Sequence, residues 1–141
     1  MTNYSLPSKT PLRESALRSR YVSNTVETMS PGRMIVALYD RLLLDLERAQ
    51  QAIAATDSMT SHECLVHAQA IVAELHDSLD RERWSGANNL VDIYLFVYNE
   101  LVTANLDKDS SRVASCRSLL QPLRDAWHEA AGIVPSAGES A

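Results

Sequence analysis

Glycine and proline are scarce in this sequence of 141 residues, which has four glycines and five prolines. Between residues 33 and 121 the only residue of either type is Gly86. A β-sandwich or barrel needs turn residues after each of its many strands, and a nucleotide-binding α/β fold needs glycine-rich loops beside its strands. The shortage disfavours both classes, and the length limits the chain to one domain with or without a tail.

Long apolar runs, basic clusters and a secretory signal are also missing. Acidic residues interrupt every apolar stretch before it reaches the 18 or so residues that a membrane span requires. The net charge is −5 and no run of lysine or arginine occurs, so a nucleic-acid partner is not expected. The first residues lack the basic start and apolar stretch of a secretory signal. We therefore expect a cytoplasmic protein.

The sequence contains no recognisable catalytic or metal-binding pattern. None of the four histidines follows a glutamate by three residues, as a di-iron site in a helical bundle requires. Cys64 and His67 are one helical turn apart, but no second pair is spaced to complete a metal site. Cys64 and Cys116 are expected to be small apolar side chains rather than a disulfide. Nucleophile elbows and phosphate-binding loops are absent, so we expect no enzyme, metal or cofactor.

Apolar residues at spacings of three and four predict four amphipathic helices. The first begins at Ser30-Pro31, where serine is an N-cap and proline occupies the first turn, and ends near 54–57. Thr60 and Glu63 have the spacing of a capping box before the second helix. The fourth helix begins at an Asp109 or Ser110 cap. The seams are Ile35, Leu38, Leu42, Leu46, Ala49 and Ile53; Leu65, Ala68, Val72, Leu75 and Leu79; and Val113, Cys116, Leu120, Leu123, Trp127 and Ala130.

The third predicted helix, from about Asn89 to Ala104, is apolar over roughly 200°, about twice the arc of an ordinary surface helix. It has two neighbouring seams: Leu90, Tyr94, Val97, Leu101 and Ala104; and Val91, Leu95, Tyr98 and Val102. Phe96 lies on the remaining polar side. Either this helix is central and covered on two sides by its own domain, or its second seam lines a groove for another apolar helix.

These elements predict an all-α fold in which residues 30–131 form an antiparallel up-and-down four-helix bundle. Residues 1–29, with Pro7 and Pro11 and no sustained period, are expected to be a flexible N-terminal arm or cap. Residues 132–141 are expected to be a disordered C-terminal tail. Pro122 lies inside the fourth helix, where we expect a kink because proline removes a backbone hydrogen bond. The prolines thus mark the segments expected to move when a partner binds.

Several blocks of the sequence between residue 21 and about residue 130 carry a family resemblance, and they keep the order that the blocks have in that family. They are Tyr21, Val26, Thr28, Ser30, Pro31 and Leu38-Tyr39-Asp40; residues 68–75 and 78–80; Asn89-Leu90, Tyr94, Leu101 and Ala104-Asn105; and residues 123–127. Together they resemble the FliS family of flagellin-specific export chaperones.

The resemblance implies a non-catalytic cytoplasmic chaperone for the biogenesis of the bacterial flagellum. It would bind the C-terminal polymerisation segment of flagellin, prevent premature filament assembly and deliver the subunit to the gate of the flagellar type III export apparatus. A helical-bundle adaptor or self-associating structural protein that uses the same apolar groove is the alternative. An unfilled groove also allows a homodimer of the unloaded chain.

The candidate flagellin-binding residues combine the arm with the apolar seams. Because one sequence does not show which seam faces inward, we expect several of them to belong to the core. The arm residue Tyr21 has two interpretations, a displaceable cap over the groove or a packing anchor at the end of the bundle. The candidates are Tyr21, Val26, Met34, Tyr39, Leu90, Tyr94, Val97, Tyr98, Leu101 and Asn105.

Overall fold

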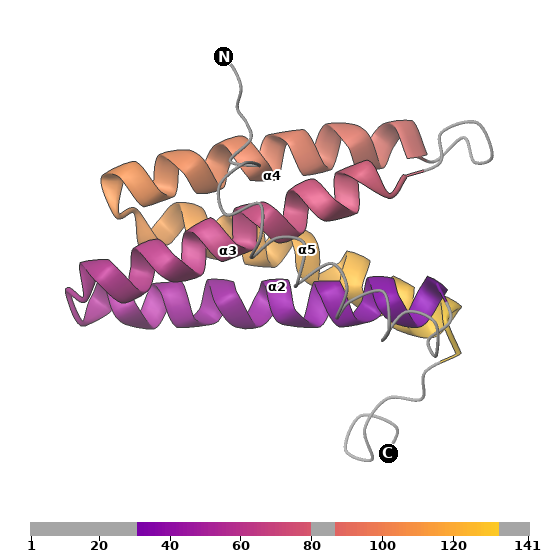
Figure 1. Cartoon of the computed structure of the whole chain (residues 1–141), viewed down its shortest axis with the longest axis horizontal. Coiled ribbons are helices and arrows are strands. Elements are labelled where there is room, and N and C mark those ends of the chain that lie inside the picture. Colours follow the sequence, from indigo (N-terminus) through magenta and orange to yellow (C-terminus); the bar gives the residue numbers. More distant parts are fainter. Residues whose placement is uncertain (1–30, 80–86, 133–141) are drawn as a thin grey trace, which may run out of the picture.

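The structure is a computed structural model that describes residues 31–79 and 87–132. It contains four helices, labelled in Figure 1: α2 (Pro31–Ala54), α3 (Ser58–Asp77), α4 (Ala87–Asp107) and α5 (Ser110–Ala130). No strand occurs in these ranges, and the all-α prediction is confirmed. The predicted arm, residues 80–86 between the second and third predicted helices, and residues 133–141 of the predicted tail lie outside the described residues.

Consecutive helices run in opposite directions, as the prediction of an up-and-down bundle requires (Figure 1). The first helix, α2, packs against both α3 and α5, and α4 packs against α3. The contact between α4 and α5 is the smallest of the four neighbouring pairs. None of the described helices combines the length and the hydropathy that a membrane span would need.

Aspartate residues cap two of the helices. The Asp109 carboxylate accepts hydrogen bonds from the backbone N–H groups of Ser111 and Arg112, so the predicted start of α5 is confirmed. Asp57 caps α3 by accepting a hydrogen bond from the Thr60 N–H at 3.1 Å. The capping-box prediction is therefore wrong: Thr60 lies inside the first turn, because the aspartate before it already satisfies a free N–H of the helix start.

Each of these capping aspartates follows a residue with left-handed backbone geometry. Thr56 and Lys108 both have a φ of 53°. A left-handed residue reverses the chain direction within a few residues, and the next residue can then start the new helix. The turns after α2 and α4 are consequently short, although neither contains a glycine at this position.

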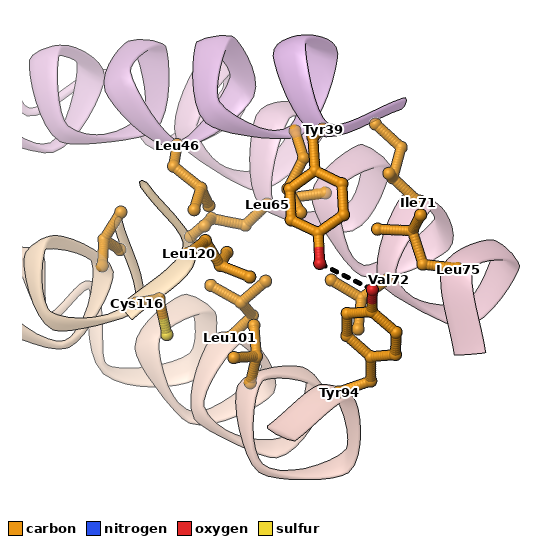
Figure 2. Packing of buried hydrophobic residues seen from close by; sticks show 14 of the residues in the cluster. Tyr39, Leu46, Leu65, Ile71, Val72, Leu75, Tyr94, Leu101, Cys116 and Leu120 are labelled. Carbon is orange, nitrogen blue, oxygen red and sulfur yellow. Dashed lines mark hydrogen bonds between the residues drawn. The ribbon is translucent and has the colours of Figure 1, made fainter. Parts of the chain in front are cut away.

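The core lies along the predicted seams. The largest fully buried side chains come from all four helices, and Figure 2 shows many of them packed together. Cys116 is buried and Cys64 is partly buried, and both are free thiols, as expected. Burial raises the pKa of the Cys116 thiol to about 11. The fully buried apolar side chains include Leu42, Leu46, Leu65, Val72, Leu75, Val97, Leu101, Val113 and Leu120.

A hydrogen bond crosses the middle of the bundle between helices that are not direct neighbours. The hydroxyl oxygens of Tyr39 on α2 and Tyr94 on α4 lie 2.6 Å apart (Figure 2). The side chain of Trp127 on α5 also hydrogen-bonds Tyr39. Because tryptophan is a donor only, the Tyr39 oxygen accepts from its indole N–H. Three helices thus share one buried polar cluster.

Helix α5 continues through Pro122 as one element. The kink expected at this position stays a prediction. The buried residues of α5 end just before it, at Leu120, and the later seam residues Leu123 and Trp127 are only half-buried.

Candidate functional site

The structure separates the two apolar seams of α4. The first seam faces inward, since Leu90, Tyr94, Val97, Leu101 and Ala104 are all buried. Tyr39, another candidate site residue, is buried with them. The candidates in this group are therefore covered by the helices of the same chain.

The second seam of α4 lies on the outside of the bundle. The side chain of Leu95 is 49% exposed, and Val91, Tyr98 and Val102 are partly buried. Leu106, one turn beyond Val102, is 78% exposed. An aliphatic stripe on a helix normally packs against its own domain. In the described structure Leu95 and Leu106 remain exposed, and the other residues of the stripe are only partly covered.

Helix α3 extends this apolar stripe sideways. Asn105 Nδ2 lies 3.0 Å from His62 Nδ1, which fixes the alignment of the antiparallel helices α3 and α4. This alignment brings the α3 residue Val66 next to the turn that contains Val102. We call this surface the α3–α4 face, and it consists of Met59, Val66, Ala70 and Ala73 from α3 with Val91, Leu95, Tyr98, Val102 and Leu106 from α4.

The predicted site residues divide into three groups by their position. Tyr98 belongs to the α3–α4 face and Asn105 lies at its edge through the contact with His62. Met34 is half-buried near the start of α2. Tyr21 and Val26 lie outside the described residues. The described candidates therefore do not form one continuous site.

Sequence reasoning missed the contribution of α3 to this surface. Met59 is 73% exposed and Val66 is 44% exposed, yet neither was selected because α3 has an ordinary seam elsewhere on its circumference. The sequence signal for this surface is that Met59 and Val66 are apolar although they lie outside the seam of α3. The small residues Ala70 and Ala73 lie beside them. That signal becomes informative only when α4 is known to lie alongside.

A second, smaller apolar surface lies on the other flank of α4, towards α5. Arg112 donates to both carboxylate oxygens of Glu100 at 3.0 Å, which fixes the alignment of these two helices. Phe96 on α4 is 55% exposed. In this antiparallel pair it lies on the flank of α4 that faces α5, as does the exposed Leu119 on the flank of α5 that faces α4. Phe96 thus lies on the outside, as the sequence predicted.

One charged side chain is buried among the described residues. The carboxylate of Asp45 on α2 is contacted by His67 Nδ1 on α3 and, at 3.2 Å, by Arg41 Nε. The thiol of Cys64 lies nearby, and both burial and the Asp45 charge raise its pKa. A raised thiol pKa disfavours the reactive thiolate. This cluster therefore ties α2 to α3 and offers no activated nucleophile.

Metal coordination finds no support in the described part of the chain. No group of three histidine, cysteine, aspartate or glutamate side chains is placed to hold a metal ion there. The arrangement that the described residues do offer is an exposed apolar face bordered by polar side chains, which is the typical character of a protein-binding surface.

Comparisons with known proteins agree with this character. Residues 13–134 match the family model described as "Flagellar protein FliS". A relative from Bacillus subtilis, named flagellar secretion chaperone FliS, is 34% identical over 110 residues, which cover 78% of this chain and 82% of the relative. Relatives of the same name from Salmonella typhimurium and Escherichia coli are each 29% identical over 110 residues, 77% of this chain and 82% and 81% of theirs.

Proposed function

The chain belongs to the FliS family of flagellar secretion chaperones, and from this membership we propose that it binds the C-terminal polymerisation segment of flagellin. In this proposal the chaperone keeps the segment from assembling in the cytosol and delivers it to the flagellar type III export apparatus. The chaperone role in flagellar export follows from the family. The client, its docking surface and the delivery step are the proposal.

The observation that carries the proposal is the α3–α4 face. Polymerising helices bury apolar faces against each other, so a chaperone that keeps such a segment apart has to offer an apolar substitute. Amphipathic helices dock into apolar grooves through residues spaced by three and four. Leu95, Tyr98 and Val102 have this spacing along α4, and Val66 widens the surface from α3.

The core seam of α4 has an indirect role in this proposal. Leu90, Tyr94, Val97 and Leu101 anchor α4 in the bundle and thereby hold the neighbouring stripe in position. Asn105 borders the face through its contacts with His62 and with Lys108, whose Nζ donates to Asn105 Oδ1 at 2.8 Å. A polar group at the edge of an apolar groove helps to fix the register of a bound helix.

A client segment that is disordered when free would lose conformational entropy on binding. Such coupled folding lowers affinity per unit of buried area but allows a long segment to wrap a large surface. Extended contact along two helices suits a chaperone that has to release its client intact.

The arm enters the proposal through Tyr21. Burying a tyrosine gives roughly 4–6 kcal/mol gross at about 25 cal/mol per Å², while ordering residues 21–29 costs about 1–2 kcal/mol for each residue. For these nine residues the ordering cost of about 9–18 kcal/mol exceeds the gain from Tyr21, so a client could displace the arm unless other arm contacts assist, and a packing anchor remains the alternative. Hydrogen exchange of residues 2–29 with and without a flagellin C-terminal peptide separates the two, because an anchor keeps its protection unchanged.

Client binding is tested by co-expressing the full chain with a C-terminal flagellin fragment and isolating the complex. Leu95→Glu places a charge on the α3–α4 face and should abolish the complex. Leu44→Glu is the matched control, because Leu44 is an exposed leucine of α2 outside that face and its substitution should leave the complex intact.

The outcomes separate the functions. A folded chain that forms no soluble stoichiometric complex with flagellin would favour the adaptor or the self-associating structural protein. Equal loss of the complex in both variants would remove the α3–α4 face from the proposal. Secretion of flagellin by cells that carry Leu95→Glu tests the delivery step, and it should fall together with binding.

A further inference from the structure

Helix α5 is held in two different ways along its length. Its first half, Ser110–Leu120, carries the buried residues Val113, Cys116 and Leu120. After Leu120, no residue of this helix is buried in the described structure. Local unfolding begins where apolar burial is low and backbone hydrogen bonds are exposed to water. The second half of α5 is therefore the part that separates most easily from the bundle.

Pro122 lies at the boundary between the two halves. Proline has no backbone N–H to donate to the carbonyl of Ser118, and its ring crowds that carbonyl. The helix thus lacks a stabilising hydrogen bond at Pro122, two residues after its last buried residue, Leu120. A hinge placed there would leave the first half of the helix in the core.

One carboxylate of α2 holds the second half of α5 in place. Arg124 Nε donates to Asp40 Oδ1 at 2.7 Å, and His128 Nε2 lies 3.2 Å from the same oxygen. Arg124 also pairs with Asp125, and Asp125 accepts from Gln121 Nε2, but these contacts are internal to α5. The two links that cross to α2 therefore depend on Asp40, whose side chain is 44% exposed. Exposed ion pairs are weak.

Further contacts complete the attachment, since the half-buried side chains of Leu123 and Trp127 pack against the core. Trp127 hydrogen-bonds Tyr39 at the buried tyrosine pair. At the end of the helix, Gly32 approaches Ala131 so closely that a Cβ on Gly32 would lie 3.2 Å from the Cβ of Ala131. The last two contacts and the two links above join the second half of α5 to α2, and they can break together.

We propose that residues 121–131 form a latch, a helical segment that detaches from α2 as a unit. Pro122 is the hinge about which the segment moves, and Asp40 is the α2 residue that holds it in place. Detachment uncovers Tyr39 of α2 and the indole of Trp127, which hydrogen-bond each other in the closed bundle. In the detached state the chain exposes an aromatic surface that is separate from the α3–α4 face. Detachment of the latch needs no client, so this proposal can be tested independently of flagellin binding.

Native-state hydrogen exchange of the full chain tests the latch. In the unmodified chain the amides of residues 123–131 should exchange faster than those of residues 114–120. Asp40→Asn removes the negative charge that contacts Arg124 and His128 and should accelerate exchange in 123–131 about tenfold, with 114–120 unchanged. Glu47→Gln is the matched control, because it neutralises an exposed carboxylate of the same helix that has no ion pair in the described structure.

Pro122→Ala tests the hinge separately. Alanine restores the N–H and should slow exchange in 123–131 below that of the unmodified chain. The proposal is overturned if Asp40→Asn changes both halves of α5 equally, if it has no more effect than Glu47→Gln, or if Pro122→Ala leaves the exchange of 123–131 unchanged.

Discussion

The hydroxyl of Tyr94 has a single side-chain partner in the described structure, the hydroxyl of Tyr39, whereas Tyr39 has a second partner in Trp127. The two tyrosines are therefore not equivalent, although both are buried and both contribute to one hydrogen bond. Tyr39 connects α2 to α4 and to α5 at the same time, and Tyr94 depends on it.

Removing either hydroxyl should reveal this asymmetry. Tyr39→Phe leaves the Tyr94 hydroxyl and the Trp127 indole without their partner, and we expect a loss of about 2–3 kcal/mol in the free energy of unfolding. Tyr94→Phe leaves Tyr39 still bonded to Trp127 and should cost about 1 kcal/mol. Urea unfolding of both variants measures the difference. Equal losses would contradict the unequal bonding of the two tyrosines.

The same buried groups predict the response to alkaline pH. Burial raises the pKa of Tyr39 and Tyr94, and it raises the pKa of Cys116 from 9.0 to about 11. The unfolded chain loses these protons at lower pH than the folded chain, so the stabilisation is complete below pH 9 and declines as pH rises. Unfolding at pH 8, 9, 10 and 11 should show about 1–2 kcal/mol of loss across this window for Cys116 alone.

A variant without the thiol provides the control for this pH dependence. Cys116→Ala leaves a cavity and lowers stability at every pH, but it should flatten the decline between pH 9 and 10, where the tyrosines contribute least. A slope identical to that of the unmodified chain would show that the thiol is not the titrating group.

The contact between the buried carboxylate of Asp45 on α2 and His67 on α3 predicts unequal costs for its two partners. His67→Ala leaves the carboxylate of Asp45 buried with only Arg41 as partner, and should destabilise the fold by about 2–3 kcal/mol. Asp45→Asn leaves His67 and Arg41 partly exposed to water and should cost about 1 kcal/mol. Thermal unfolding at pH 7 compares the two variants. A larger loss for Asp45→Asn would indicate that the attraction between the two side chains, rather than the desolvation of the carboxylate, determines the change in the free energy of unfolding.

The turn after α2 offers a stabilising substitution. Thr56 is β-branched and has a φ of 53°, a geometry that costs L-residues about 1–2 kcal/mol and glycine almost nothing. After the greater entropy loss of glycine is subtracted, Thr56→Gly should gain about 0.5–1 kcal/mol in the free energy of unfolding. Lys108→Gly should gain less, because Lys108 also donates to Asn105. A lower melting temperature for Thr56→Gly would contradict the strain at this turn.

The periodic helices could be predicted from the sequence because burial dictates their spacing. Leu42, Leu65 and Val113 are each buried as their seams require. The first helix ends at Ala54, within the predicted range. The cap at Asp57 was missed because two overlapping capping patterns occur in sequence, and only the backbone geometry decides between them.

The candidate surface could be predicted only in part. The width of the apolar arc on α4 allowed either a central helix covered on two sides or a second seam on the outside, and because the two seams have similar composition the sequence does not decide which one faces inward. Tyr94 belongs to the core and Tyr98 to the exposed face, although they are adjacent on the helix. Val66 depends on the pairing of α3 with α4, which is a property of the fold rather than of the local sequence.

The packing of α2 against α5 joins the first described helix to the last one. During synthesis, a ribosome adds residues at about 5–20 per second and N-terminal elements fold first, so α2, α3 and α4 are complete before α5 can close the bundle. Until then the surface of α2 that packs against α5, which includes Tyr39, stays exposed to water. A flagellar secretion chaperone thus passes through a brief nascent stage in which its own helices need shielding.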